Sequence, residues 1–112
     1  MKSYTDIEQS KLLAKILPLE SADMGYLWNS TSFCEYPVSS QTIFKKVENI
    51  PCWSLATLLS VLDFPSLTQN KEDEWEVCVP NHKSDGYIEV SADNPVDACV
   101  EMILKLRRLN LS

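Results

Sequence analysis

The C-terminal third of the chain decides the fold; residues 75–109 read WEVCVPNHKSDGYIEVSADNPVDACVEMILKLRRL. Apolar Trp75, Val77 and Val79 alternate with the residues between them, which is the period-two pattern of a half-buried strand. The Gly-containing stretch at residues 80–86 predicts a turn, and residues 87–91 return as the partner strand. We therefore expect an antiparallel hairpin here.

A helix is expected directly after the hairpin. Asn94 is a good N-cap, and Pro95 suits the first helical position because its missing N–H would have no partner there anyway. Asp97 places negative charge in the first turn, where it complements the helix dipole. The apolar residues that follow recur with helical spacing and should pack on the sheet: Val96, Cys99, Val100, Ile103 and Leu106.

Two further helices are expected upstream. Residues Thr5 to Glu8 have the form of a capping box, and the apolar residues behind them predict a first helix of about ten residues that Pro18 ends. The nearly continuous apolar stretch at residues 50–62 predicts a second helix with Pro51 in its first turn. A helix this apolar is normally buried against a sheet.

The segment between these helices is expected to form short strands, at residues 24–28, 33–38 and 42–47. No two strands are joined by a convincing parallel crossover, which favours an antiparallel arrangement. The predicted fold class is α+β, with a small antiparallel sheet of four to five strands packed with three helices in the order α-β-β-(β)-α-β-β-α. The whole chain, residues 1–112, is expected to be a single domain.

Composition excludes several classes of protein. The 112 residues are 45% hydrophobic and 23% charged, which is typical of a globular chain and argues against extensive disorder. A net charge of −6 with one histidine makes direct binding to a nucleic-acid backbone improbable, because such proteins usually cluster Lys and Arg. The longest apolar stretches are too short to span a bilayer, and no secretory signal core is present, so we expect a cytoplasmic protein with reduced thiols.

The negative charge is concentrated in one region. Residues 71–97 carry a net −6, whereas residues 1–70 carry −2 and residues 98–112 carry +2. Glu74, Glu76 and Glu89 are predicted to share a sheet face that docks on a basic protein partner, or that imitates a phosphate backbone. A solvated strand face, kept from edge-to-edge pairing by its charge, is the competing interpretation.

Two aromatic residues are further candidates for partner binding. Tyr26 and Trp28 stand beside a turn-like stretch at residues 29–32, and Tyr and Trp are enriched at binding hot spots. Packing in the core is the competing interpretation for both side chains.

The cysteines and the single histidine do not favour an enzyme. Cys34, Cys52, Cys78 and Cys99 are separated by 18, 26 and 21 positions, whereas zinc sites usually contain close pairs. We expect buried, unreactive thiols, with a small enzyme that uses a reactive cysteine as the alternative. Glutamates on the same face should raise the pKa of Cys78, and His82 is expected to be an exposed turn residue. No catalytic residue, cofactor or metal site is predicted.

Three stretches together carry a family resemblance: LPLESADM at residues 17–24, IPCWSLA at residues 50–56 and DNPVDACVEMI at residues 93–103. They resemble a group of short hypothetical proteins found in Bacteroides genomes, prophages and mobile elements. The resemblance implies a cytoplasmic bacterial or phage-associated protein, and it implies no activity, cofactor or catalytic residue. The leading functional hypothesis is therefore an accessory protein that acts by protein–protein contact, with a second copy of the chain as one candidate partner.

Overall fold

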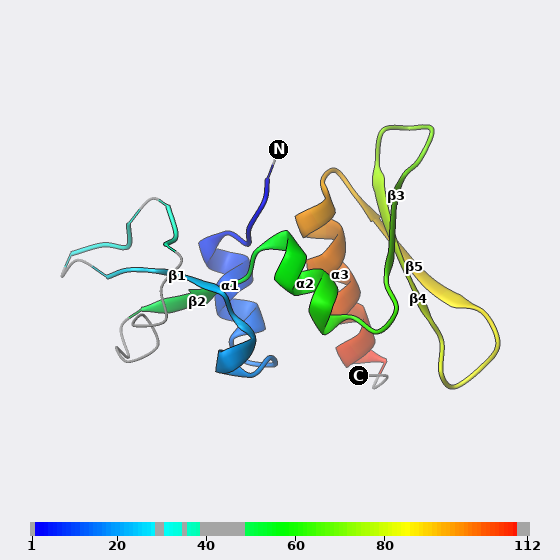
Figure 1. Ribbon diagram of the computed structural model, residues 1–112, viewed down its shortest axis with the longest axis horizontal. Coiled ribbons are helices and arrows are strands. Elements are labelled where there is room, and N and C mark those ends of the chain that lie inside the picture. Colours follow the sequence, from blue (N-terminus) through cyan, green and yellow to red (C-terminus); the bar gives the residue numbers. More distant parts are fainter. Residues whose placement is uncertain (1, 29–30, 35, 39–48, 110–112) are drawn as a thin grey trace. The chain divides into compact units, whose positions relative to one another are not determined.

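The computed structural model describes residues 2–28, 31–34, 36–38 and 49–109. Within these residues the chain is an α+β fold with three α-helices and five strands, in the order α1, β1, β2, α2, β3, β4, β5, α3 (Figure 1). The strands form two antiparallel sheets, β1–β2 and β3–β4–β5. The predicted fold class is confirmed, and the strands divide between two sheets.

The chain divides into two compact units. We call Tyr4–Thr57 the N-terminal unit, and Leu58–Ser112 together with Met1–Ser3 the C-terminal unit. The division falls within α2 (Leu55–Val61), and each unit has a sheet of its own. The single domain expected from the sequence stays a prediction.

The N-cap of helix α1 (Ile7–Leu13) is Asp6, one residue after the predicted cap Thr5. The capping box is formed by Asp6 and Gln9: the Gln9 amide donates to Asp6 Oδ1 at 2.8 Å, and the Asp6 amide donates to Gln9 Oε1 at 3.1 Å. The prediction of Thr5 as the cap is wrong because its side chain is buried and bonded elsewhere. The helix also ends before Pro18, and a short 3-10 helix (Leu19–Ser21) follows.

Strands β1 (Met24–Tyr26) and β2 (Ile50–Cys52) pair antiparallel, with Tyr26 opposite Ile50. The prediction that a helix starts at Ile50 is therefore wrong for its first turn. Pro51 is tolerated in this two-stranded ribbon because edge strands leave some N–H groups unpaired. Apolar character alone did not distinguish this strand from a helix, since both bury their side chains.

Helix α2 begins only after Ser54, which Asp23 holds in place. Asp23 accepts from the Ser54 amide at 2.9 Å and from its hydroxyl at 2.6 Å, and the Thr57 amide donates to Ser54 Oγ at 3.3 Å. Burial raises the pKa of Asp23, but the hydrogen bonds from Ser54 and Thr57 outweigh it, so the net shift is downward. The ionised carboxylate is thus part of the start of this helix.

The other predicted strands of the N-terminal unit are reduced to isolated bridges. Phe33 bridges Trp28, and Val38 bridges Gly25, so the described part of residues 33–38 contains bridges in place of the expected strand. The strand predicted at residues 42–47 lies outside the described residues.

The hairpin predicted in the C-terminal unit is confirmed as β4 (Trp75–Pro80) and β5 (Tyr87–Ala92), with Val77 opposite Val90. Its turn is closed by a hydrogen bond from the Asn81 amide to the Gly86 carbonyl at 3.0 Å. Gly86 has φ +114°, a conformation that side-chain-bearing residues rarely adopt. Strand β3 (Ser66–Gln69), which was not predicted, adds a third strand beside β4.

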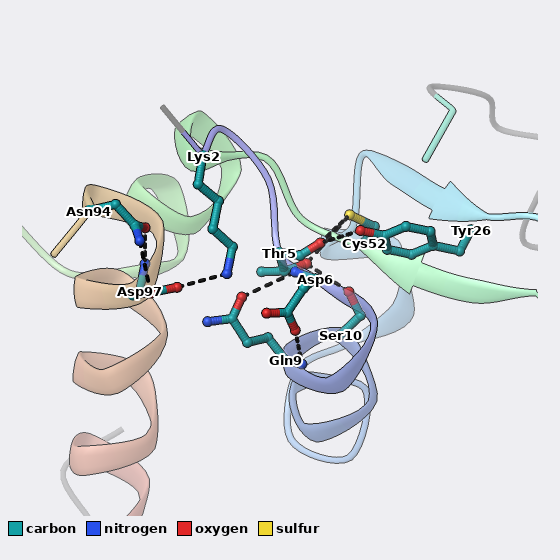
Figure 2. A network of polar contacts seen from close by, with 9 residues as sticks. All are labelled: Lys2, Thr5, Asp6, Gln9, Ser10, Tyr26, Cys52, Asn94 and Asp97. Atoms are coloured by element: carbon teal, nitrogen blue, oxygen red, sulfur yellow. Dashed lines mark hydrogen bonds and ion pairs between the residues drawn. The ribbon is translucent and has the colours of Figure 1, made fainter. Parts of the chain in front are cut away.

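Helix α3 (Pro95–Arg108) agrees with its sequence signals. Asn94 is the N-cap and accepts from the Asp97 amide at 2.9 Å, while its own side-chain N–H donates to the Asp97 carboxylate at 2.8 Å. Lys2 forms an ion pair of 2.8 Å with Asp97 in the same unit (Figure 2). The helix contacts β4 and β5, and its apolar face, including Val96 and Val100, is buried.

Candidate functional site

The three-stranded sheet has two chemically different faces, because side chains alternate along each strand. On one face Leu67, Val77 and Val90 are neighbours across the three strands, and Val77 is fully buried. We call the opposite face the outer face. It carries the alternate residues of the same register: Ser66, Thr68, Glu76, Cys78, Pro80, Tyr87, Glu89 and Ser91.

The outer face remains accessible. Helix α3 lies alongside β4 and β5 (Figure 1), and the buried side chains of both strands, Val77, Val79 and Ile88, all belong to the apolar face. On the outer face Glu89 is exposed and the Tyr87 side chain is 73% exposed. Charged and aromatic groups of this face can therefore meet a partner.

Two glutamates flank the half-buried thiol of Cys78 on this face. Glu89 is the cross-strand partner of Cys78, and Glu76 lies two residues away on the same strand. Burial raises the pKa of the Cys78 thiol, and the negative charges of Glu89 and Glu76 raise it further. This confirms the expected effect of the glutamates, and because only a thiolate is a strong nucleophile, the arrangement disfavours Cys78 as a catalytic residue.

The two carboxylates are not neutralised by a neighbouring cation within the described chain. Neither Glu76 nor Glu89 forms an ion pair with a described residue. Lys105 reaches β5 from α3, but its Nζ donates to the backbone carbonyl of Glu89, at 3.4 Å. The outer face therefore keeps two carboxylates ready for cations from outside the unit.

Glu74 lies at the edge of this site, one residue before β4 begins. It precedes β4 in the turn that follows β3: its amide donates to Asn70 Oδ1 at 3.0 Å, and its carbonyl accepts from the Asn70 amide at 2.8 Å. Its side chain is half-buried, and the exposed acids of this turn are Glu72 and Asp73. The carboxylates of the region thus form a strand-face pair and a separate turn group.

The structure separates the two aromatic candidates. Tyr26 is only 3% exposed, and its hydroxyl donates to the Thr5 carbonyl at 2.8 Å (Figure 2), so the expectation of an exposed contact residue is wrong and core packing is correct. Trp28 is 40% exposed, and its ring packs against Phe33 edge-on at 4.9 Å between centroids. Only Trp28 keeps a surface that a partner could touch.

No local sequence pattern indicates the buried polar network around Thr5. The Thr5 hydroxyl lies 2.8 Å from Ser10 Oγ and accepts from the Trp53 amide at 3.2 Å, and the Thr5 carbonyl accepts from Tyr26. The Cys52 thiol also belongs to the network, at 3.3 Å from the same carbonyl (Figure 2). Burial raises the pKa of Cys52, so this thiol acts as a neutral hydrogen-bonding group.

His82 is an exposed turn residue, as expected, and it has a partner that no sequence signal indicated. Its Nε2 lies 2.5 Å from the Asp63 carboxylate, 19 positions away, and both side chains are 60% exposed.

The cysteines do not form a metal site in the described part of the chain. Among the described residues, no group of three or more His, Cys, Asp or Glu side chains could hold a metal ion. Burial raises the pKa of Cys99 to about 11.

Comparisons with protein-family models, curated proteins and solved structures give no match. The resemblance to the Bacteroides proteins therefore stays a prediction. Among the described residues, no helix has the length and apolar character that crossing a membrane requires. The function is therefore inferred from the chemistry of the outer face.

Proposed function

We propose that this chain is a non-enzymatic, cytoplasmic accessory protein of bacterial or phage origin, and that its outer face binds a basic segment of a partner protein. The observation that carries the proposal is the pair Glu76 and Glu89, which flank Cys78 on the face that α3 leaves open. The concentration of charge supports it, because residues 71–97 carry a net −6. An acidic patch of this kind attracts a basic surface and speeds its association.

The spacing of the face fits Lys or Arg side chains on an extended segment. Side chains on neighbouring strands lie about 5 Å apart when opposite and about 7 Å apart on the diagonal. Alternate residues of a bound strand are also separated by about 7 Å, so its cations could meet Glu76 and Glu89 in turn. Tyr87 adds an exposed ring on which a cation can stack, two residues from Glu89.

Titration with a short peptide of alternating Arg and Thr, followed by amide chemical shifts, tests this placement. We expect the shift changes to centre on Glu76, Cys78, Glu89 and Ser91, and to shrink as salt is added, because exposed ion pairs are screened. A peptide of alternating Glu and Thr is the matched probe and should leave these amides unchanged. Shift changes centred on the Asn70–Glu74 turn, or on α3, would contradict the proposal.

A further inference from the structure

The C-terminal unit has a second surface of different character, an apolar pocket. It has a volume of about 90 Å³ and lies between the end of α2, the end of β4 and α3. Its apolar walls are Val61, Leu62, Val79, Pro80 and Leu106. The Asp63–His82 pair completes the lining, so the pocket offers an apolar interior beside a polar rim.

Two of the large hydrophobic side chains that the described part of the C-terminal unit exposes are neighbours of this lining. Phe64, 79% exposed, follows Asp63, and Leu109 lies one helical turn beyond Leu106. Isolated exposed apolar residues are common on proteins, but a group around one pocket is typical of an interaction surface.

Phe64 is held outward by an unfavourable backbone. Its φ is +50°, in the left-handed region that bulky residues avoid, and the next residue is Pro65. The ring is therefore largely exposed to water, on a backbone conformation that carries a cost. Strained residues of this kind are enriched at functional sites.

We propose that two copies of the chain associate through this surface, with Phe64 of each copy inserted into the pocket of the other. A projecting ring and an apolar pocket separated by one or two residues form a self-complementary patch, which is what a two-fold interface requires. Charge supports a second copy as the occupant. The patch combines the exposed Asp63–His82 pair with the basic last turn of α3 (Lys105, Arg107, Arg108), so that the Asp63 carboxylate of one copy can meet a base of the other across the axis.

The outer face cannot serve this purpose, because two acidic faces would repel each other. Self-association is therefore independent of the basic partner proposed above. Replacing Glu76 and Glu89 by Gln should leave the dimer intact, and Phe64→Ser should leave binding of the Arg/Thr peptide intact.

Sedimentation velocity of the full chain over a range of concentrations tests the dimer. We expect a concentration-dependent dimer that Phe64→Ser weakens at least about tenfold, as for a central aromatic contact, with the amide spectrum of the fold retained. Leu12→Ser is the matched control, since it removes an exposed apolar side chain from the N-terminal unit, and it should not change the dimer. A chain that stays monomeric at all concentrations would overturn the proposal.

Isotope-filtered NOE spectra of a mixture of labelled and unlabelled wild-type chain provide a second readout that involves no variant. Cross-peaks between the Phe64 ring of one copy and the methyl groups of Val79 or Leu106 of the other are expected. A dimer that lacks these cross-peaks and is unaffected by Phe64→Ser would show that the contact lies elsewhere and would also overturn the proposal.

Discussion

The two units of this chain are stabilised by different chemistry. In the N-terminal unit the buried hydroxyls of Thr5 and Ser10 and the Cys52 thiol are joined in one hydrogen-bond network. In the C-terminal unit an apolar sheet face, with Val77 at its centre, is buried beside α3. Loss of a buried hydroxyl should therefore destabilise the N-terminal unit most, and loss of a buried methyl group should destabilise the C-terminal unit most.

The largest effect is expected for Thr5→Val, which keeps the shape of the side chain and removes its hydroxyl. The Trp53 amide and the Ser10 hydroxyl would then be buried without this partner, at about 1–3 kcal/mol for each group. We expect the free energy of unfolding to fall by about 3 kcal/mol. Hydrogen exchange should show lost protection in α1, β1 and β2, and denaturant unfolding gives the magnitude.

Thr5→Ser is the matched control, because it removes the methyl group and keeps the hydroxyl. It should lower the free energy of unfolding by about 1 kcal/mol, the value of one buried methyl group. If Ser destabilised the protein more than Val, packing and not the hydrogen-bond network would stabilise this unit.

Val77→Ala should have the next largest effect, in the other unit. It leaves a cavity in the buried face of the sheet and should lower the free energy of unfolding by about 2 kcal/mol. Thr68→Ala, on the outer face of the adjacent strand, should change it by less than about 0.5 kcal/mol. If denaturant unfolding showed an equal loss of free energy for Thr68→Ala and Val77→Ala, the outer face would also be buried.

Asp23→Asn should weaken the start of α2 by about 1 kcal/mol near neutral pH, as the loss of a helix cap does. The pKa of Asp23 in the folded chain is below its ordinary 3.8, so the ionised form stabilises the fold. This contribution is fully present above pH 3.8 and is lost as the pH falls through the folded pKa. Unfolding curves of the two proteins should therefore converge below pH 3.8; a constant gap would contradict the assignment.

The smallest effect concerns the outer face itself. Glu89→Gln removes a negative charge opposite Cys78, so the thiol pKa should fall and labelling of Cys78 by a thiol reagent should accelerate about two- to threefold. Glu101→Gln removes the same charge from an exposed position on α3 and should leave the labelling rate unchanged. Equal rates in all three proteins would place Glu89 too far from the thiol to matter.

Sequence patterns predicted the C-terminal unit better than the N-terminal unit, for a physical reason. The alternation of β4 and the Asn94–Pro95 signal depend on residues close in the chain, and both agree with the structure. Strand β3 was missed because Leu67 is its only apolar residue. In the N-terminal unit, the Thr5 network joins residues up to 48 positions apart, and no local pattern contains such pairs.

The candidate site could be predicted in part. Alternation along β4 and β5 placed Glu76 and Glu89 on one face with Cys78. The same alternation along β5 also indicates Tyr87, because it lies two residues from Glu89 and so on the same face. The alternation did not show that β4 begins only at Trp75, because Glu74 is bonded to Asn70 in the preceding turn. The burial of Tyr26 depends on its bond to Thr5, which sequence spacing does not indicate.

The affinity of the full chain for the Arg/Thr peptide, measured in two isosteric double variants, tests the central claim most directly. Glu76→Gln with Glu89→Gln removes two charges from the outer face, and Glu72→Gln with Asp73→Asn removes two from the neighbouring turn. If the outer face binds the basic segment, the first pair should weaken binding about tenfold and the second by less than about twofold. Equal losses in both would show that diffuse acidity, and not this surface, attracts the peptide.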